Sequence, residues 1–218
     1  MTATARPMPV VVLISGRGSN LRAIAAQARA GQLPIEIRAV VSDRAEAAGL
    51  AWSRDAGLHC EVLPPADFQD RAAYDDALAA LVARFEPGLV VLAGFMRILG
   101  PAFVDRYSGR AMNIHPSLLP RHRGLHTHRR ALAAGDTEHG ASVHFVTREL
   151  DGGPVVLQAR VPVRTDDDED RLAQRVLEQE HRIYPMAIEW FAAGRLQWRE
   201  GAAWLDGRRL DAPVVIPT

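Results

Sequence analysis

The sequence predicts an α/β protein whose central sheet is mostly parallel, with an antiparallel part towards the C-terminus. In the first half, apolar runs of strand length alternate with segments of helical periodicity, which is typical of βαβ units. In the second half, two strand-like runs follow each other across a short turn, which favours an antiparallel pair. With 218 residues, of which 48% are hydrophobic, the chain can cover both faces of such a sheet. We therefore expect a Rossmann-like arrangement in a single domain, residues 1–218.

Four strands and three helices are expected in the first half. Runs such as PVVVLISG are continuously apolar, as buried strands of a parallel sheet should be. The segment 74–85 has apolar residues at Leu78, Leu81 and Phe85, a spacing that puts them on one helical face. The expected strands are 9–16, 35–42, 59–63 and 87–95, and the expected helices are 20–30, 45–56 and 74–85.

Three further strands and two further helices are expected in the second half. The sequence DGGP at 151–154 supplies the turn between the last two strands. The long final helix starts with the acidic cluster 166–170, which suits the positive end of the helix dipole. We interpret this cluster as a solvated helix entry rather than a metal site. The expected strands are 110–116, 140–147 and 155–163, and the expected helices are 127–136 and 165–194.

Composition argues against several classes of protein. The 26 acidic and 26 basic residues give no net charge, so electrostatics does not support a nucleic-acid partner. All 26 basic residues are arginine, which excludes Schiff-base catalysis, Ser-Lys hydrolases and the Walker A loop. The longest apolar runs are too short to cross a membrane, and the N-terminus lacks a signal-peptide pattern, so a cytoplasmic location is expected. The single cysteine, Cys60, excludes an internal disulfide and is expected in the core.

The sequence NIHPSLLP at 113–120 is the strongest candidate for chemistry. Residues two apart in a strand point to the same face, so Asn113 and His115 should project together while Ile114 turns into the core. Pro116 cannot donate to a sheet ladder, so the strand should end there, at the edge where α/β proteins place their sites. A histidine can exchange a proton at neutral pH, and an amide can stabilise an oxygen that gains charge. Asp151, between its turn glycines, is the best candidate to orient the histidine, although it is also an ordinary turn residue.

The glycine-rich turn ISGRGSNL at 14–21 leaves three interpretations open. The amides of Gly18, Ser19 and Asn20 could bind a phosphate at the start of the first helix. A dinucleotide site would require a third glycine where Leu21 stands, although Asp43 could act as the ribose-binding acid. The third interpretation is a plain tight turn in which Ser19 or Asn20 caps the helix.

Two other candidate sites are weaker. His122, His126 and His128 lie close in sequence, but they lack a partner cysteine, the HExxH spacing and an obvious carboxylate, so no metal is expected. The chain also has no G-x-S-x-G elbow, which argues against a serine hydrolase.

Seven blocks in order along the chain resemble the phosphoribosylglycinamide formyltransferases. The blocks are VVLISGRGSNL, VVLAGFMRIL, MNIHPSLLP, GLHTHRRALAAGDTEHGASVHFV, ELDGGPV, EQEHRIYP and AAWLDGRRL, from about Val10 to Leu210. The resemblance implies the formyltransferase fold and the use of 10-formyltetrahydrofolate as formyl donor, without a metal. It also implies glycinamide ribonucleotide as acceptor, in purine synthesis, and a cis peptide bond before Pro120.

Residue roles follow from the same resemblance. Asn113 would bind the formyl oxygen as it gains charge, His115 would act as the general acid, and Asp151 would hold His115 in its charged form. The amine would attack directly, without a covalent enzyme intermediate. The ribonucleotide would contact Gly18, Ser19, Asn20 and Glu180. The folate would contact Asn113, Asp151 and residues of three further segments, namely Arg71, Met96, Arg97, Ile98, Leu99, Thr147, Arg148, Glu149 and Leu150.

The resemblance implies that the N-terminal half binds the ribonucleotide phosphate, and that the C-terminal half binds folate and carries the catalytic residues. Leu177 departs from relatives with a polar residue there, so one phosphate contact is either missing or supplied by an arginine. The loop 121–124 is also more basic than expected.

Several rival functions and the oligomeric state are left open. Methionyl-tRNA formyltransferase and formyltetrahydrofolate hydrolase share the Asn-x-His chemistry but should carry additional domains. An NAD-dependent oxidoreductase or a non-catalytic folate- or nucleotide-binding module are the alternatives from other classes. A homodimer is left open.

Overall fold

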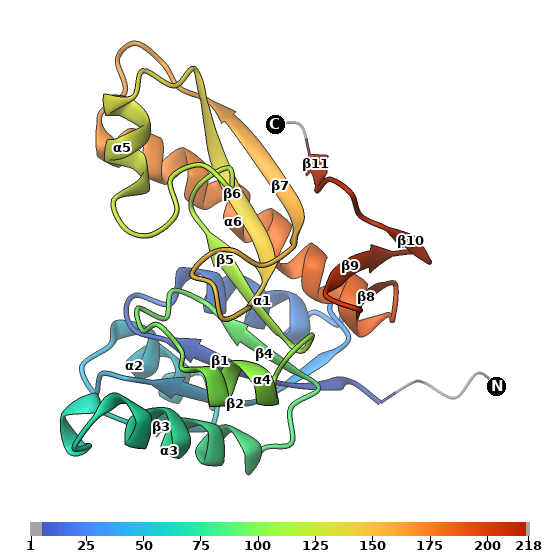
Figure 1. The fold of residues 1–218 in the computed structure, drawn as a ribbon. Coiled ribbons are helices and arrows are strands. Elements are labelled where there is room, and N and C mark those ends of the chain that lie inside the picture. Colours follow the sequence, from blue (N-terminus) through green and yellow to red (C-terminus); the bar gives the residue numbers. More distant parts are fainter. Residues whose placement is uncertain (1–5, 217–218) are drawn as a thin grey trace.

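The computed structural model describes residues 6–216, and its centre is an eight-stranded sheet with helices on both faces (Figure 1). Residues 1–5 and 217–218 lie outside the described residues. The first ten residues, in which no signal peptide is expected, are therefore described only in part. The strands of this sheet follow the order β11-β7-β6-β5-β4-β1-β2-β3. They are β1 (Met8–Ile14), β2 (Ile35–Ser42), β3 (Cys60–Val62), β4 (Leu89–Leu92), β5 (Ala111–His115), β6 (Glu138–Phe145), β7 (Val155–Pro162) and β11 (Val214–Ile216).

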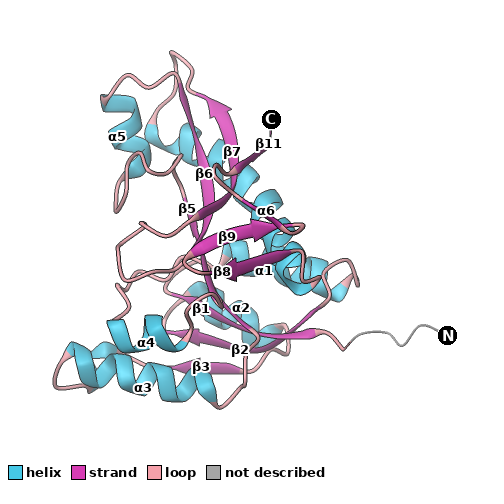
Figure 2. Ribbon diagram, turned by 45° about the vertical axis from the view of Figure 1, so that its right-hand side comes forward, coloured by secondary structure: helices cyan, strands magenta, loops and turns pink. Residues whose placement is uncertain are grey.

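Six α-helices and one short 3-10 helix connect these strands. They are α1 (Ser19–Arg29), α2 (Ala48–Asp55), α3 (Arg71–Ala83), α4 (Pro101–Arg106), α5 (Thr127–Ala133), α6 (Glu169–Ala192) and η1 (Pro65–Asp67). A second, three-stranded sheet is formed by β8 (Leu196–Arg199), β9 (Ala202–Leu205) and β10 (Arg208–Arg209). Figure 2 shows β8 and β9 side by side, and neither strand pairs with the main sheet.

Strand pairing confirms the mostly parallel sheet and its antiparallel C-terminal part. β1 is parallel to both β2 and β4, and β5 continues the parallel set beside β4. β6 is antiparallel to both β5 and β7. Since the chain goes out from β1 to β2 and β3 and then returns to β4 on the other side, the strand order reverses at β1. Ligands of open α/β sheets bind at such a reversal, beyond the carboxyl ends of the strands.

Two apolar clusters cover the faces of the sheet. On one face, β1 and β4 pack against Leu21 and Ile24 of α1 and against Val176 and Ile183 of α6. On the other face they pack against Leu78 of α3 and against α4. Each fully buried aliphatic side chain stabilises the fold by about 1.5–3 kcal/mol relative to an exposed one. The sheet is therefore fixed from both sides, and the loops at its strand ends are held on a rigid base.

Several elements differ from the sequence-based expectation. α3 begins at Arg71, earlier than the expected 74, because the Asp70 side chain accepts a hydrogen bond from the Ala73 amide and caps the helix. α2 and α5 are shorter than expected. Three features were not expected from the sequence: α4, the small sheet and β11, which pairs with β7 in parallel.

Two further expectations concern single features. The peptide bond between Leu119 and Pro120 is cis, as the resemblance implied. Among residues 6–216, no helix has both the length and the apolar character that a membrane-crossing segment needs.

Candidate active site

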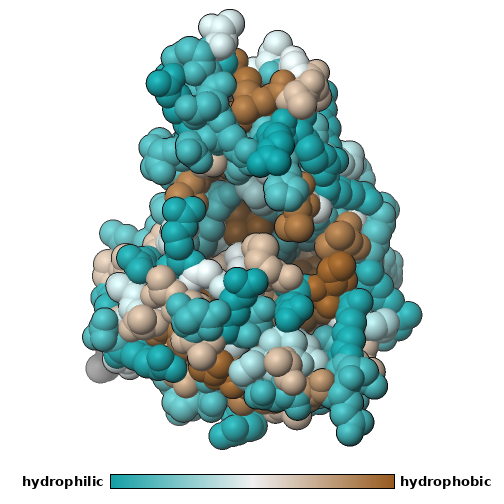
Figure 3. All heavy atoms as spheres, turned by 90° about the vertical axis from the view of Figure 1, so that its left-hand side faces the viewer, coloured by the Kyte–Doolittle hydropathy of each residue, from teal (hydrophilic) through white to brown (hydrophobic). Residues whose placement is uncertain are grey.

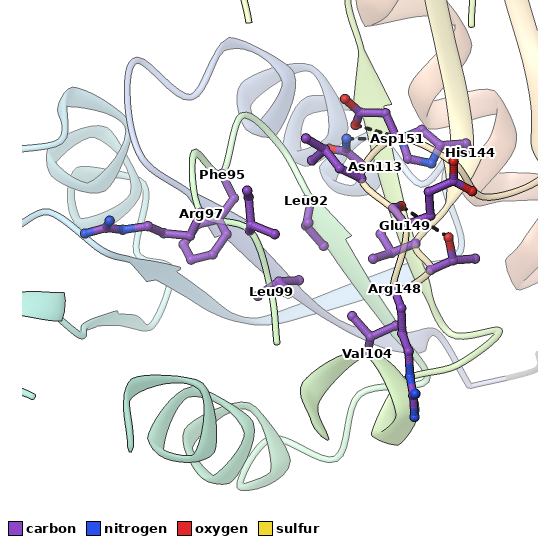
Figure 4. Close-up of a pocket in the computed structure, with 14 residues that line it drawn as sticks. Leu92, Phe95, Arg97, Leu99, Val104, Asn113, His144, Arg148, Glu149 and Asp151 are labelled. Carbon is purple, nitrogen blue, oxygen red and sulfur yellow. Dashed lines mark hydrogen bonds and ion pairs between the residues drawn. The ribbon is translucent and has the colours of Figure 1, made fainter. Parts of the chain in front are cut away.

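Asn113 and His115 lie at the carboxyl end of β5, as their spacing predicted. The strand ends at His115, immediately before Pro116, and Ile114 belongs to the apolar core. β5 lies between β4 and β6, with Asn113 beside Leu92 on one side and His144 on the other. Figure 4 shows Asn113, His144 and Asp151 gathered at one end of a pocket.

His115 is buried, with 6% of its surface exposed, and both its ring nitrogens face oxygen atoms. Nδ1 lies 3.5 Å from a carboxylate oxygen of Asp151, and Nε2 lies 3.1 Å from the backbone carbonyl of His122. A carbonyl oxygen only accepts hydrogen bonds, so Nε2 carries a proton in this arrangement. The Asp151 carboxylate lies beside the other nitrogen, Nδ1, so the ring is held between two oxygen acceptors.

Asp151 is held in place by the loop that precedes α5 and by its own backbone conformation. Its carboxylate accepts a hydrogen bond of 2.9 Å from the Gly124 amide, and its backbone has a φ of 49°, in the left-handed region. The flanking glycines permit this tight loop: a Cβ on Gly153 would lie 1.9 Å from the Phe145 carbonyl oxygen. The prediction that Asp151 approaches His115 is therefore matched by their geometry.

His144 also lines this site, although no sequence pattern had indicated it. Its Nδ1 lies 2.9 Å from the Phe145 carbonyl, to which it must donate. Burial lowers the pKa of His144 to about 4, so the ring is neutral at pH 7 and Nε2 is left as an acceptor. The Asn113 amide nitrogen, 3.2 Å away, donates to it. This contact fixes which way the Asn113 amide points and leaves its second N–H for a ligand.

Most of the residues expected to contact folate line one pocket. Two exposed apolar side chains are among its lining residues, since Ile98 is 53% and Leu150 48% exposed. Figure 3 shows this side of the molecule with a central hollow that has hydrophobic atoms at its base. Nine of the eleven residues expected to contact folate line this pocket. They are Arg97, Ile98, Leu99, Asn113, Thr147, Arg148, Glu149, Leu150 and Asp151.

The two remaining folate candidates, Arg71 and Met96, line the adjoining pocket. Arg71 donates a hydrogen bond of 2.7 Å to the Ile98 carbonyl, so it supports the segment between the two pockets. Arg97 extends away from Asn113 in Figure 4 and forms an ion pair of 3.2 Å with Asp43. Arg148 is likewise paired with Asp105 at the surface. The side chains of Arg97 and Arg148 are therefore engaged outside the pocket.

The glycine-rich turn forms a second pocket, on the other side of β5's carboxyl end. Gly18 precedes α1 with a φ of 70°, and neither Ser19 nor Asn20 caps the helix with its side chain. The expectation that Ser19 or Asn20 caps the helix with its side chain was therefore wrong. The turn is packed closely, since a Cβ on Gly18 would lie 2.8 Å from the Cα of Gly49. Two exposed arginines, Arg17 and Arg44, line the same pocket.

Asn20 and Glu180 meet in this second pocket, although they are 160 positions apart. The Asn20 amide donates a hydrogen bond of 2.6 Å to the Glu180 carboxyl group. Burial raises the pKa of Glu180 to about 7. The Asn20 Oδ1 is buried and has no hydrogen-bond partner among the described residues. The pair thus combines a carboxyl group whose pKa is near neutral pH with a buried oxygen that can accept a hydrogen bond from a ligand hydroxyl.

The residues expected to bind the ribonucleotide and those expected to bind folate do not divide into an N-terminal and a C-terminal half of the chain. Glu180, from the second half, contacts Asn20, while Arg71, Met96, Arg97, Ile98 and Leu99, from the first half, line the pockets near Asp151. The catalytic candidates lie between these pockets, because Ile114 lines the second and Asn113 the first.

The remaining candidates take structural positions. Asp43 pairs with Arg97, and Leu21 is fully buried in the core, so the features of a dinucleotide site are used for packing. His122 and His128 contact different partners, Asp136 and His139. In the described part of the chain, no group of three or more His, Cys, Asp or Glu side chains is placed to hold a metal ion. Burial raises the pKa of the Cys60 thiol, which suits a packed side chain rather than a nucleophile.

Comparison with known proteins places this geometry in a family. The formyl transferase family matches residues 8–188. The chain is 57% identical over 203 residues to the phosphoribosylglycinamide formyltransferase of Escherichia coli (strain K12), covering 93% of this chain and 96% of that protein. It is 41% identical over 191 residues to the trifunctional purine biosynthetic protein adenosine-3 of Bos taurus, covering 88% of this chain and 19% of that larger protein.

A solved structure agrees with these sequence matches. The phosphoribosylglycinamide formyltransferase of Coxiella burnetii has a TM-score of 0.93 at 50% identity, over 97% of this chain and all of that one. The expected fold is confirmed, and so is the resemblance that the seven sequence blocks indicated.

Proposed function

This chain belongs to the formyl transferase family, and we propose that it transfers a formyl group from 10-formyltetrahydrofolate to the amine of glycinamide ribonucleotide. The class of enzyme expected from the sequence, a transferase of formyl groups, is confirmed. The acceptor and the place in purine synthesis are carried over from the names of the relatives. We propose that residues 1–218 act as one formyltransferase domain, with both substrates meeting at the end of β5.

The single observation that carries the proposal is the group formed by Asn113, His115 and Asp151. The amine would attack the formyl carbon, and the carbonyl electron pair would move onto the formyl oxygen. The free N–H of Asn113 is directed by His144 and would donate to that oxygen as its charge develops. When the bond from the formyl carbon to the folate nitrogen breaks, His115 would protonate the departing nitrogen, and the proton that the attacking amine loses would restore the proton on His115. Asp151, 3.5 Å from Nδ1, would stabilise the imidazolium before this step.

The pocket at the glycine-rich turn suits the ribonucleotide. The amides of Gly18, Ser19 and Asn20 lie at the start of α1, where the helix dipole favours an anion. Arg17 and Arg44 add positive charge to the same pocket. They are the arginines that would replace the phosphate contact missing at Leu177.

The ribose hydroxyls would meet the buried pair of Asn20 and Glu180. The unpartnered Asn20 Oδ1 can accept from a hydroxyl, and the Glu180 carboxyl group can accept or donate, since its pKa is about 7. This pocket opens beside Ile114 and Pro116. A ribonucleotide held there would have its amine near the end of β5.

The pocket that contains Asn113 and Asp151 suits the folate donor. Its buried walls are formed by Leu92, Phe95 and Leu99, while Ile98 and Leu150 lie at the rim. Flat apolar surfaces flanked by a few polar groups are typical of sites for aromatic cofactors. Because Arg97 and Arg148 are paired elsewhere, backbone groups of 96–99 and 147–151 would supply most of the polar contacts, with Arg71 near the outer end. The folate is a co-substrate here, and no step requires a metal.

The proposal is tested by mixing the protein with 10-formyltetrahydrofolate and glycinamide ribonucleotide and recording the absorbance of the folate product. A parallel reaction without the ribonucleotide is the control. Turnover that requires the amine supports the transferase. Folate release at the same rate without the amine would instead identify a hydrolase, and absence of turnover in both reactions would refute the proposal.

A further inference from the structure

His122 contacts the proposed general acid through its backbone and an aspartate through its side chain. We propose that His122 is a positioning residue for His115, and that Asp136 anchors it. The inference rests on the proposed function, because it assigns a purpose to the orientation of His115. Neither His122 nor Asp136 has a role in the binding of either substrate described above.

The first observation is the contact between the two histidines. The His122 carbonyl oxygen lies 3.1 Å from Nε2 of His115, on the edge of the ring opposite the one that faces Asp151. These two acceptors hold the ring by both nitrogens. A rotation of the ring about its Cβ–Cγ bond would lose both contacts at once. The position of the His122 carbonyl therefore determines where the proton of Nε2 points before a substrate receives it.

The second observation is that the side chain of His122 is tied to a separate part of the chain. Its Nε2 lies 2.7 Å from a carboxylate oxygen of Asp136, with 14% and 18% of the two side chains exposed. A hydrogen bond to a carboxylate in such a shielded place is stronger than one at the surface. The Asp136 backbone amide itself donates to the Ala131 carbonyl at the end of α5. Asp136 is thus a fixed anchor rather than a loose surface group.

The third observation is the backbone conformation of His122. Its φ is 53°, in the left-handed region that residues with a side chain rarely adopt. Such a conformation costs on the order of 1–3 kcal/mol and persists only where neighbouring contacts maintain it. The loop has these contacts on both sides: the Ser117 hydroxyl donates to the Arg121 carbonyl at 2.6 Å, and the Gly124 amide donates to Asp151. His122 lies between these two contacts, and its own side chain is held by Asp136.

Neighbouring histidines do not compete for Asp136. The ring of His139 lies 6.1 Å from that of His122, and burial lowers the pKa of His139 to about 4, so it is neutral at pH 7. His128 is hydrogen-bonded to His139. The carboxylate of Asp136 is therefore left to His122. Without this contact, the peptide at 122 can relax, its carbonyl can turn away and His115 loses the acceptor on Nε2.

The test compares His122→Phe and Asp136→Ala with the wild type in the formyl transfer assay. Each should lower kcat on the order of 10-fold, because small displacements of a reacting group are costly, while KM for both substrates stays within about twofold. The double variant should be no slower than the slower single variant, since both changes break one contact. His122→Gln can still donate to Asp136 and should keep most of the turnover.

The matched control is His59→Phe, which removes a histidine–carboxylate contact of 3.1 Å to Glu61; neither residue lines either pocket. It should leave kcat unchanged. A second readout is the exchange of the ring proton on Nε2 of His115, followed by NMR and assigned by its loss in His115→Ala. This proton should exchange faster with water in His122→Phe, whereas a general loss of stability would not affect it selectively. Thermal unfolding of each variant checks that the fold is intact.

Three results would overturn the inference: unchanged kcat in His122→Phe, additive losses in the double variant, or a change confined to KM. His115→Ala, measured in the same series, separates this failure from that of the proposed function. If His115→Ala is inactive and His122→Phe is normal, only the positioning role is lost. If His115→Ala itself retains turnover, the proposed mechanism fails first.

Discussion

The unfolding free energy of the wild type should fall as Glu180 ionises with rising pH. In Glu180→Gln this contribution to the fall should be absent. Glu180 is 7% exposed and its carboxyl group is hydrogen-bonded to the Asn20 amide. Burial raises its pKa from 4.5 to about 7. The folded protein therefore binds the Glu180 proton more tightly than the unfolded chain does. A glutamine side chain has nearly the same shape and can accept the same hydrogen bond, but it does not ionise.

The sign and size of the effect follow from this difference in pKa. The stabilisation by the neutral carboxyl group is fully present below pH 4.5 and is lost as the pH rises through about 7. A shift from 4.5 to about 7 corresponds to about 3 kcal/mol of unfolding free energy. The wild type should lose this amount relative to Glu180→Gln between pH 4.5 and pH 8. Other titrating groups are the same in both proteins, so their effects cancel in the comparison.

The assay is urea unfolding of both proteins at a series of pH values between 4.5 and 8, followed by circular dichroism. The quantity of interest is the unfolding free energy of Glu180→Gln minus that of the wild type. It should rise with pH and level off above neutrality. A difference that stays constant over this range, or one that falls, would refute the assignment of a neutral, buried carboxyl group at position 180.

Three other predictions concern the site and its supports. His115→Ala and Asp151→Asn should each lower turnover by about 10²-fold or more, with unchanged unfolding midpoints; near-normal turnover would remove the role assigned to that residue. Gly18→Ala should raise KM for the ribonucleotide, because the new Cβ would meet Gly49 and the backbone φ of 70° becomes strained, and an unchanged KM would contradict the phosphate site. Tyr184→Phe removes a hydroxyl that lies 3.0 Å from the Leu92 carbonyl at the end of β4 and 2.8 Å from the Met112 carbonyl within β5, and it should cost about 1–2 kcal/mol in urea unfolding. An unchanged midpoint would show that these contacts contribute nothing.

The sheet and the end of β5 could be predicted because their signals are local. Continuous apolar runs define buried strands, and the alternation of Asn113, Ile114 and His115, followed by Pro116, fixes which side chains share a face. The antiparallel pairing of β6 and β7 followed in the same way from the turn between them. By contrast, α4 has only six residues and β11 only three, too few to show a period. β11 is also added to the sheet by pairing with β7, which is distant in sequence.

The parts of the site that the sequence did not reveal depend on contacts between distant segments. His144 was visible as part of an alternating strand, but its role depends on the register that places it opposite Asn113. The cap expected on α1 was wrong because Asn20 uses its side chain for Glu180 instead. His122 and Asp136 form their contact across α5, and no local pattern indicates that the His122 carbonyl faces His115. Local sequence patterns thus indicated the candidate reacting residues better than the residues proposed to hold them.

The most direct test of the proposed reaction follows the formyl group itself. The protein is mixed with glycinamide ribonucleotide and with 10-formyltetrahydrofolate that carries an isotope label in the formyl group, and the products are separated. We predict that the label appears as a formamide on the ribonucleotide amine, with one equivalent of folate released for each label transferred. Label recovered as free formate, or retained on the folate, would contradict direct transfer between two substrates that meet at Asn113 and His115.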